Sequence, residues 1–408
     1  MAQDFTASMR ELWASDHLQI DGLYSPAERL SGKIAEKELQ ATNGNSYTYL
    51  QIGINEGTDI DPYGDTVVQD SSDTKTTLVL DKTSQYDFHQ EEDEKGRYQA
   101  FDSFKETHFK ASVLEHYRKT NGEFFFQVFN SATNVFDDGN LGGTAGNPIT
   151  MTSSNIDDFA FELSAELEEQ AEMGGGFATV LPPKQLAKLN LAAFGSGSSP
   201  AGDAFDGKLN LGIENSFVGS YFETDFYKTK LVPTGKKITY TDQPADTNTL
   251  VVDGVTITMV ASLTGGDGEV LIGADADATY ANLIALLNNP AINTANAKGW
   301  AINGANYRKA RYFGGKLTAA GVVAVVSKNG KKAITETLAN ATLGTDVISW
   351  CPIMRYGSVE MACPRGVRLT SGKNKNGTVT THTSRKRFGV ATPSQYTTRF
   401  AVAEVKVG

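Results

Sequence analysis

Hydrophobic and polar residues alternate between residues 75 and 88, and this alternation predicts β-strands. Leu78, Leu80, Tyr86 and Phe88 occupy even positions, while the odd positions are mostly polar. A period of two places the apolar side chains on one side of a strand and the polar ones on the other. The segment is therefore predicted to form two long exposed strands, paired as a ribbon with one apolar side, that end at the acidic run 91–94.

Apolar residues spaced by three and four positions predict helices elsewhere in the chain. One helix is expected over residues 97–119, and the aromatic run 124–129 that follows it is expected to be buried. A second helix is expected over residues 155–173, where Ser154 and Asp157 form a predicted capping box. Two shorter helices are predicted at residues 4–16 and 280–287.

Short apolar segments predict further strands. Residues 47–54, 177–181 and 397–407 have the length and composition of strands. Residues 251–257 read as a hairpin, because Asp253 and Gly254 are the residue types that a two-residue turn requires.

Composition narrows the class of protein. The 408 residues are 40% hydrophobic and 21% charged, as in globular proteins, and 40 glycines favour a β-rich body with many loops. Cys351 and Cys363 lie in separate Cys-Pro pairs, which excludes a disulfide framework and a zinc ribbon. The N-terminus has no signal-peptide pattern, and the longest apolar stretch, 321–326, is shorter than the ~20 residues of a membrane helix. We therefore expect synthesis in a cytosol and no insertion into a membrane.

Motifs for catalysis and cofactor binding are incomplete throughout. The five histidines form no H-E-x-x-H zinc motif. Segment 366–373 has one residue too many between its glycines for a phosphate loop, and Asn374 stands where a Ser or Thr must bind Mg²⁺. Asp59, Asp61 and Asp65 begin like a calcium loop, but no predicted helices flank them, so a solvated acidic loop is expected. We expect no enzymatic activity, no cofactor and no metal.

The formal net charge of −11 is unevenly distributed. Residues 301–408 carry 17 Lys+Arg and 4 acidic residues, a balance of +13, whereas residues 1–300 have a balance of −24. One interpretation is a basic domain beside an acidic one, both solvated. The other is complementarity, in which the acidic part of one copy meets the basic part of another, or a basic face meets nucleic acid.

The most basic aromatic run is Tyr-Arg-Lys-Ala-Arg-Tyr-Phe at residues 307–313. No named DNA-binding module surrounds it, and the net acidity disfavours tight binding to a duplex. A weak, salt-sensitive contact with phosphates stays open beside a solvated or protein-facing basic surface.

The order of segments resembles a known family. A short N-terminal arm precedes the ribbon, a long helix follows, and Asn155-Ile-Asp-Asp-Phe then leads into the next helix. The segment Val-Leu-Pro-Pro-Lys-Gln-Leu-Ala-Lys-Leu at residues 180–189 is the most telling local match. This succession resembles the major capsid proteins of tailed bacteriophages, the Hong Kong 97-like fold. The hairpin at 253–257 and the helix after it resemble a module inserted into phage structural proteins.

The resemblance implies a Hong Kong 97-like α+β fold in seven segments. They are an N-terminal arm (1–46), a strand with the extended ribbon loop (47–96), a peripheral domain with its spine helix (97–154), the first part of an axial domain (155–233), a small β-rich insertion domain (234–300), the second part of the axial domain (301–349) and the C-terminal strands of the peripheral domain (350–408).

The resemblance also implies a non-enzymatic shell protein. Copies would assemble into the hexamers and pentamers of an icosahedral head, in the host cytoplasm, and remain in the virion around double-stranded DNA. Expected partners are other copies, a portal protein, a separate scaffold or decoration protein, and DNA through weak non-specific contact. Fewer than 50 residues precede the first predicted strand, so a long N-terminal scaffolding segment is not expected.

Opposite charges mark the expected contacts between subunits. The acidic side of the contact would come from the extended loop, through Asp87, Glu91, Glu92, Asp93 and Glu94. The basic side would come from Arg385, Lys386 and Arg387 of another copy. Two alternatives remain: a β-rich carbohydrate-binding or carbohydrate-active protein that uses the acidic loop 56–73, and another phage structural protein such as a tail-tube or decoration protein.

Overall fold

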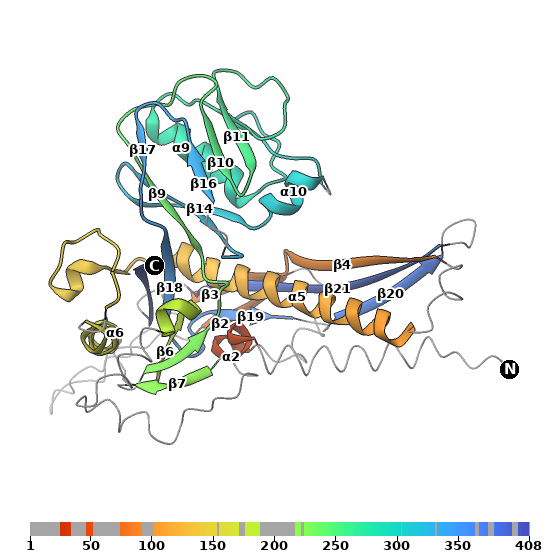
Figure 1. Cartoon of the computed structure of the whole chain (residues 1–408), viewed down its shortest axis with the longest axis horizontal. Helices are drawn as coiled ribbons and strands as arrows, with labels where there is room; N and C mark the ends of the chain where they lie inside the picture. Colours follow the sequence, from red (N-terminus) through yellow and green to blue (C-terminus); the bar gives the residue numbers. More distant parts are fainter. Residues whose placement is uncertain are drawn as a thin grey trace, which may run out of the picture. The chain divides into compact units, whose positions relative to one another are not determined.

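In the computed structural model, the chain forms two units. Figure 1 labels many of their helices and strands. The first unit comprises residues 1–120 and 355–399, and the second comprises residues 121–354 and 400–408. Helices and sheets occur in both, so the predicted α+β class is confirmed. The structure describes residues 25–33, 46–51, 74–91, 101–152, 155–170, 176–187, 217–221, 224–302, 304–330, 333–363, 367–373, 379–393 and 399–407.

A long three-stranded ribbon dominates the first unit. Strand β21 (Val379–Ala391) lies in its centre, with β4 (Lys82–Glu91) and β20 (Val367–Lys373) antiparallel on either side. At the end of the ribbon, β21 also pairs with β19 (Glu360–Ala362), and β19 pairs in parallel with β1 (Gly32–Lys33). The 13 residues of β21 span about 44 Å at ~3.4 Å per residue, more than twice the length of a usual strand.

The predicted pairing of the ribbon was wrong. Strand β3 (Thr74–Val79) pairs with β2 (Ser46–Gln51), while β4 pairs with β21, so the two alternating segments do not form a hairpin with each other. A two-residue hairpin turn needs positive φ angles, and neither Leu80 nor Asp81, which connect β3 to β4, has one. The strand predicted at 47–54 is confirmed over residues 47–51, which lie in β2, and residues 52–54 lie outside the described residues.

Helix α5 (Phe101–Ser131) continues well beyond the predicted end at residue 119. Its residues 101–120 belong to the first unit and 121–131 to the second. The aromatic run 124–129 lies inside this helix and is largely buried, as expected. In the second unit, Gly122 brings the helix backbone against Lys328, where a Cβ atom would lie 2.8 Å from the Lys328 carbonyl oxygen.

A ten-stranded sheet forms the body of the second unit. Helix α6 (Ile156–Gln170) confirms the helix predicted from residue 155, and Phe159, Ala160 and Leu163 pack its inner side into the core. The sheet comprises β14 (Phe313–Ala319), β15 (Val322–Ser327), β9 (Thr234–Tyr240), β18 (Ile348–Arg355), β6 (Phe177–Leu181), β8 (Thr224–Lys228) and β7 (Phe217–Tyr221) in this order, with β17 (Ala341–Leu343), β22 (Phe400–Lys406) and β5 (Val135–Phe136) attached.

A five-stranded sheet forms a subdomain of the second unit. Its strands, in order, are β13 (Ala297–Lys298), β12 (Glu269–Leu271), β11 (Val255–Val260), β10 (Thr249–Val252) and β16 (Ile334–Glu336). Helices α9 (Ala276–Asn288) and α10 (Ala305–Ala310) accompany it. The hairpin between β10 and β11 is confirmed, and Asp253 and Gly254 have the positive φ angles of 51° and 73° that its turn requires. Strand β16 comes from beyond residue 300, and the seven-segment division stays a prediction.

Residue 300 separates the acidic part of the sequence from the basic part, but it is not a boundary between the two structural units. Residues 301–354 and 400–408 fold in the second unit, whereas 355–399 fold in the first. The interpretation of a basic domain beside an acidic one is therefore wrong. The basic residues of the C-terminal quarter are shared between two units, and their partners must be found site by site.

Candidate functional site

The two faces of the ribbon differ in chemistry. Residues that stand opposite each other in an antiparallel ladder have side chains on the same face. Tyr86 is opposite Ser384 and Phe88 is opposite His382, and these define what we call the inner face. Gln85 is opposite Arg385, so both belong to the other side, the outer face.

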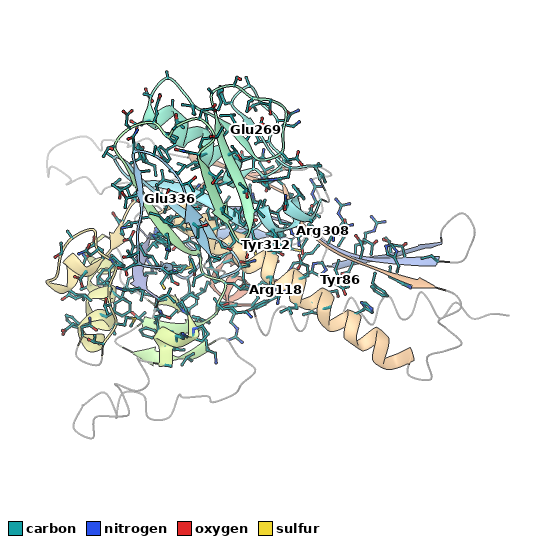
Figure 2. The ribbon with its side chains drawn as sticks, turned by 45° about the horizontal axis from the view of Figure 1, so that its top comes forward. Tyr86, Arg118, Glu269, Arg308, Tyr312 and Glu336 are labelled. Carbon is teal, nitrogen blue, oxygen red and sulfur yellow. The ribbon has the colours of Figure 1, made fainter. Side chains whose placement is uncertain are left out.

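The inner face packs on α5 through aromatic and polar contacts. The Tyr86 hydroxyl and His108 Nδ1 form a hydrogen bond of 2.9 Å, and Figure 2 shows Tyr86 on the side of the ribbon toward α5. The Phe88 ring stacks between His108 and His382, with centroid distances of 4.4 and 4.7 Å. Burial lowers the pKa of His108 and raises that of Tyr86. Both shifts favour the neutral forms of these two side chains.

His116 fixes the ribbon to α5 at a second point. It is fully buried, and its two ring nitrogens hydrogen-bond Ser84 Oγ of β4 at 2.9 Å and Ser384 Oγ of β21 at 2.6 Å. One imidazole thus joins two strands to the helix. These contacts explain His116 as a structural residue.

The outer face carries positive charge that no described carboxylate neutralises. Arg368 of β20 and Arg385 of β21 are opposite each other, and both are exposed. Neither forms an ion pair with any carboxylate in the described part of the chain. Like charges directly opposite each other destabilise a sheet. An acidic group supplied by another molecule would therefore stabilise this part of the ribbon.

An acidic group lies farther along the same face. Asp87 of β4 is opposite Thr383, two positions from the level of Arg385, and it is exposed. Glu91 is the last residue of β4 and is opposite Val379. The outer face therefore has a basic region around Arg385 and an acidic residue, Asp87, beside it.

The predicted contact residues do not form one cluster. Lys386 lies on the inner face, where its Nζ is 3.0 Å from Glu28 Oε1 of α2 (Pro26–Leu30) in a largely buried ion pair. Arg387 shares the outer face with Arg385, and its Nε donates to the Leu80 carbonyl oxygen at 2.8 Å. Glu92, Asp93 and Glu94 lie outside the described residues.

Sequence reasoning missed Arg368. The segment around it was tested only as a phosphate loop and rejected. Val367 and Leu369 alternate with Arg368 and Thr370, and this period of two was the available signal for a strand. Residues 59–65, the acidic loop considered as a calcium site, lie outside the described residues.

A pocket of about 250 Å³ opens in the second unit, where α5 ends. Its walls include Phe129, Val135, Lys316, Leu317, Trp350 and Val402. The ammonium group of Lys316 donates to the carbonyl oxygens of Phe129 and Ala132, at 2.8 and 2.6 Å, and so caps the helix. Burial lowers the pKa of Lys316 to about 8.

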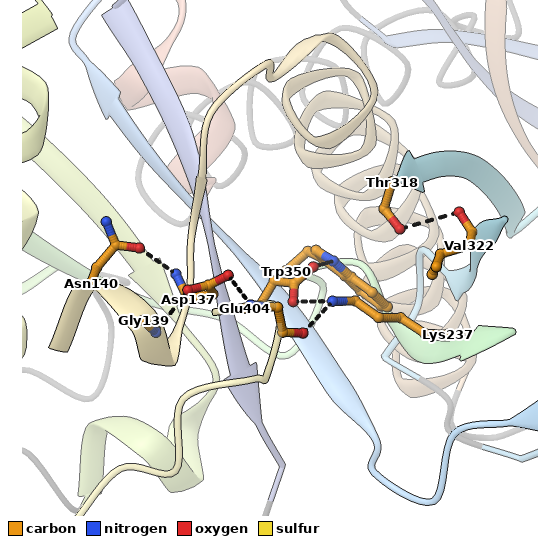
Figure 3. Close-up of polar contacts among 9 residues, drawn as sticks. Asp137, Gly139, Asn140, Lys237, Thr318, Val322, Trp350 and Glu404 are labelled. Atoms are coloured by element: carbon orange, nitrogen blue, oxygen red, sulfur yellow. Dashed lines mark hydrogen bonds and ion pairs between the residues drawn. The ribbon is translucent and has the colours of Figure 1, made fainter. Parts of the chain in front are cut away.

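The Trp350 wall of this pocket is held in place by a buried carboxylate. Trp350 Nε1 donates to Glu404 Oε1 at 3.1 Å, and Glu404 also forms an ion pair with Lys237, as Figure 3 shows. Glu404 is 1% exposed. The indole therefore has a fixed orientation, and the pocket it lines is preformed.

Within the described residues, no group of three or more His, Cys, Asp and Glu residues could hold a metal ion. No helix among them has both the length and the apolar character needed to cross a membrane.

No protein-family model matches the chain, and no curated protein sequence matches it. Several solved phage structures are similar to it. One from Mycobacterium phage Che8 has a TM-score of 0.48 at 10% identity, over 93% of this chain and 91% of that chain. The capsid of Cyanophage P-SCSP1u has a TM-score of 0.44 at 8% identity, over 95% and 89%. The capsid of Ralstonia phage GP4 has a TM-score of 0.44 at 10% identity, over 93% and 87%. Because these TM-scores are below 0.5, we base the proposed function on the chain's own elements.

Proposed function

We propose that this chain is the major capsid protein of a tailed phage, with a Hong Kong 97-like fold. Copies of it assemble into the hexamers and pentamers of an icosahedral head that encloses double-stranded DNA. The observation that carries the proposal is the outer face of the ribbon, where Arg368 and Arg385 are exposed opposite each other and lack a described carboxylate partner.

A second copy of the chain is the partner that this face fits. The ribbon has two edge strands, β4 and β20, and edge strands present backbone groups that another chain can bind. Its basic region requires an acidic partner, and the same face provides one at Asp87. A surface with both charges can therefore bind another copy of itself.

The ribbon, α5 and the five-stranded subdomain each have a role in this proposed assembly. The ribbon is the extended loop that lies on a neighbouring subunit, α5 is the spine helix, and the five-stranded subdomain is the inserted module. In this proposal the acidic residues Asp87, Glu91, Glu92, Asp93 and Glu94 of one copy meet Arg385 and Arg387 of another. Lys386 instead secures the ribbon to α2 within its own chain.

The proposal extends to the protein's location and other partners. The protein assembles in the host cytoplasm and remains in the virion, where it contacts the portal and, where present, a scaffold or decoration protein. Contact with packaged DNA is weak and independent of sequence, because the chain carries a net charge of −11.

Charge exchange on the outer face tests the proposal. We expect wild-type protein to form rings or shells in negative-stain images, and Arg385→Glu or Asp87→Arg to raise the concentration needed for assembly by about tenfold. The double variant, which exchanges the two charges, should regain most of the assembly. Thermal unfolding should change little in all three, because both positions are exposed.

Arg308→Glu is the matched control. Arg308 is also exposed, but it lies on α10 of the second unit. We expect this control to assemble at the wild-type concentration. The proposal is wrong if the wild-type protein remains a monomer by analytical ultracentrifugation at every concentration and salt tested.

A further inference from the structure

The pocket at the end of α5 has the size of a site for one side chain. Its volume of about 250 Å³ is below the ~300–1,000 Å³ typical of small-molecule sites, yet several times the ~30 Å³ that one water occupies. Most of its wall is apolar, from Phe129, Val135, Trp350 and Val402. Such a pocket suits an aromatic or large aliphatic side chain.

The rim of the pocket is open to solvent in the single chain. Leu317 is 50% exposed and Val135 is 40% exposed, although both are large apolar residues. Lys316 adds one positive charge to this rim, and none of the described carboxylates forms an ion pair with it. Its ammonium group has three donors, of which two bind the helix carbonyls. An apolar group with a carboxylate beside it would match both the rim and the third donor.

Helix α6 carries such a group on its outer side. Phe161 is 55% exposed, whereas Phe159, Ala160 and Leu163 pack into the core. Asp158 and Glu168 are exposed on the same helix. The sequence of α6, IDDFAFELSAELEEQ, contains acidic residues but no Lys or Arg. Phe161 is thus an exposed aromatic group on an acidic helix.

Phe161 and the pocket are separate surfaces of one chain. Phe161 is not among the residues that line the pocket. A contact between them in two copies is therefore heterologous, with a different patch on each partner. Contacts of this kind lead to closed rings when the rotation between copies closes, and to open filaments when it does not.

We propose that Phe161 of one copy inserts into the pocket formed by Phe129, Leu317 and Trp350 of the next copy, with an α6 carboxylate beside Lys316. This inference rests on the proposed self-assembly and specifies one of its contacts. It is independent of the outer face of the ribbon, which lies in the first unit. Burial of the aromatic ring and pairing of the desolvated ammonium are both favourable, and buried aromatic groups are frequent hot spots of interfaces.

Crosslinking between engineered cysteines tests the contact. Because loss of the Phe161 ring should itself weaken assembly, the variant with both Phe161→Cys and Leu317→Cys is assembled at a protein concentration well above a tenfold-raised threshold and then treated with a short bis-maleimide. We expect it to give a ladder of linked oligomers in a denaturing gel. Phe161→Cys alone and Leu317→Cys alone are the controls, and they also report any reaction of the native Cys351, which is buried, and Cys363. A third control pairs Phe161→Cys with Ile302→Cys, because Ile302 is 67% exposed but is not part of the pocket.

The outcomes separate this contact from assembly itself. The inference is overturned if particles form but the Phe161–Leu317 pair gives no more crosslinking than the controls. If the wild-type protein itself forms no particles, the proposed function is overturned as well. A gel and a negative-stain image of the same sample distinguish these two results.

Truncation of the aromatic side chain gives a second measurement. We expect Phe161→Ala to raise the concentration needed for assembly about tenfold or more, as for an interface hot spot, and to leave thermal unfolding almost unchanged. Ile302→Ala is the matched control, since it also shortens an exposed apolar side chain, and it should assemble like wild type. Equal assembly of Phe161→Ala and Ile302→Ala would overturn the inference.

Discussion

The five-stranded subdomain and the ribbon are stabilised in different ways. The subdomain has a dense apolar core, in which Leu250, Ile257, Tyr280, Leu283 and Trp300 are each no more than 4% exposed. The described contacts between the ribbon and α5 instead involve stacked rings and hydrogen bonds from histidines and serines. Hydrophobic burial contributes stability without directional requirements, whereas each polar contact depends on one geometry.

This difference predicts which region of the chain a bound partner would stabilise most. A sheet whose apolar core is already buried within its own unit is stabilised little further by a neighbouring copy. A long ribbon with two edge strands and like charges opposite each other gains from any partner that pairs those edges and neutralises those charges. In the proposed assembly, the ribbon is thus the region in which assembly and folding would be most closely coupled, and the following substitutions test the two regions in turn.

Removal of core volume from the subdomain should have the largest effect. Leu283 of α9 is fully buried, so we expect Leu283→Ala to destabilise the second unit by about 2–5 kcal/mol, through lost burial and the cavity that remains. Urea unfolding followed by circular dichroism measures this. Ala285→Ser, at an exposed position of the same helix, should cost no more than ~0.5 kcal/mol. A similar small cost for Leu283→Ala would contradict a tightly packed core.

Loss of the ion pair between α2 and the ribbon should come next. We expect Glu28→Gln to cost about 2–4 kcal/mol, slightly below the ~3–5 of a fully buried pair, because the Glu28 side chain is 17% exposed while the Lys386 side chain is 4% exposed. The pair Lys82–Asp81 is the control, since its side chains are 34% and 53% exposed. Asp81→Asn should cost less than ~1 kcal/mol. Hydrogen exchange of the β21 amides measures the destabilisation in both variants. Equal destabilisation would contradict the view that burial makes the Glu28–Lys386 pair the stronger one.

The histidine that joins the two strands to α5 should have a smaller effect. His116→Ala leaves Ser84 and Ser384 without their buried partner, which we expect to cost about 1–3 kcal/mol. Faster hydrogen exchange should be confined to β4 and β21. His89 is exposed, and its ring Nδ1 forms a hydrogen bond of 3.0 Å with Thr381 Oγ1 in the ribbon, so His89→Ala is the matched control. Equal protection of the β4 and β21 amides in the two variants would show that contacts other than those of His116 fix the ribbon to α5.

Local elements could be predicted from the sequence, but distant strand partners could not. The hairpin at Asp253 and Gly254 and the helix from residue 155 were predicted correctly, because turn chemistry and periodicity act within a few residues. The partner of β4 lies about 290 residues away in β21, and an alternating pattern does not encode which strand it pairs with.

The candidate site was predictable to a similar extent. Period two correctly separates Lys386 from Arg385 and Arg387 onto opposite faces of β21, although the sequence analysis treated all three as one cluster. The Glu28 partner of Lys386 is 358 residues away, so only the fold reveals it. The pocket at Lys316 combines residues from α5, β14, β18 and β22, and no local pattern could have indicated it.

The smallest effect is expected at the junction of the ribbon with β1, and it depends on pH. Burial raises the pKa of Glu360 in β19 to about 7. Between about pH 4.5 and 7 the folded protein therefore binds more protons at this group than the unfolded chain does, so its contribution to stability falls as the pH rises through that interval. Glu360→Gln removes the charge and should stabilise the first unit at pH 8, by less than ~1 kcal/mol because Glu360 is only half buried. Thermal unfolding at pH 8 and at pH 4.5 measures this, and the advantage of the variant should disappear at the lower pH. A difference of the same size at both pH values would show that the effect arises from packing and not from the charge.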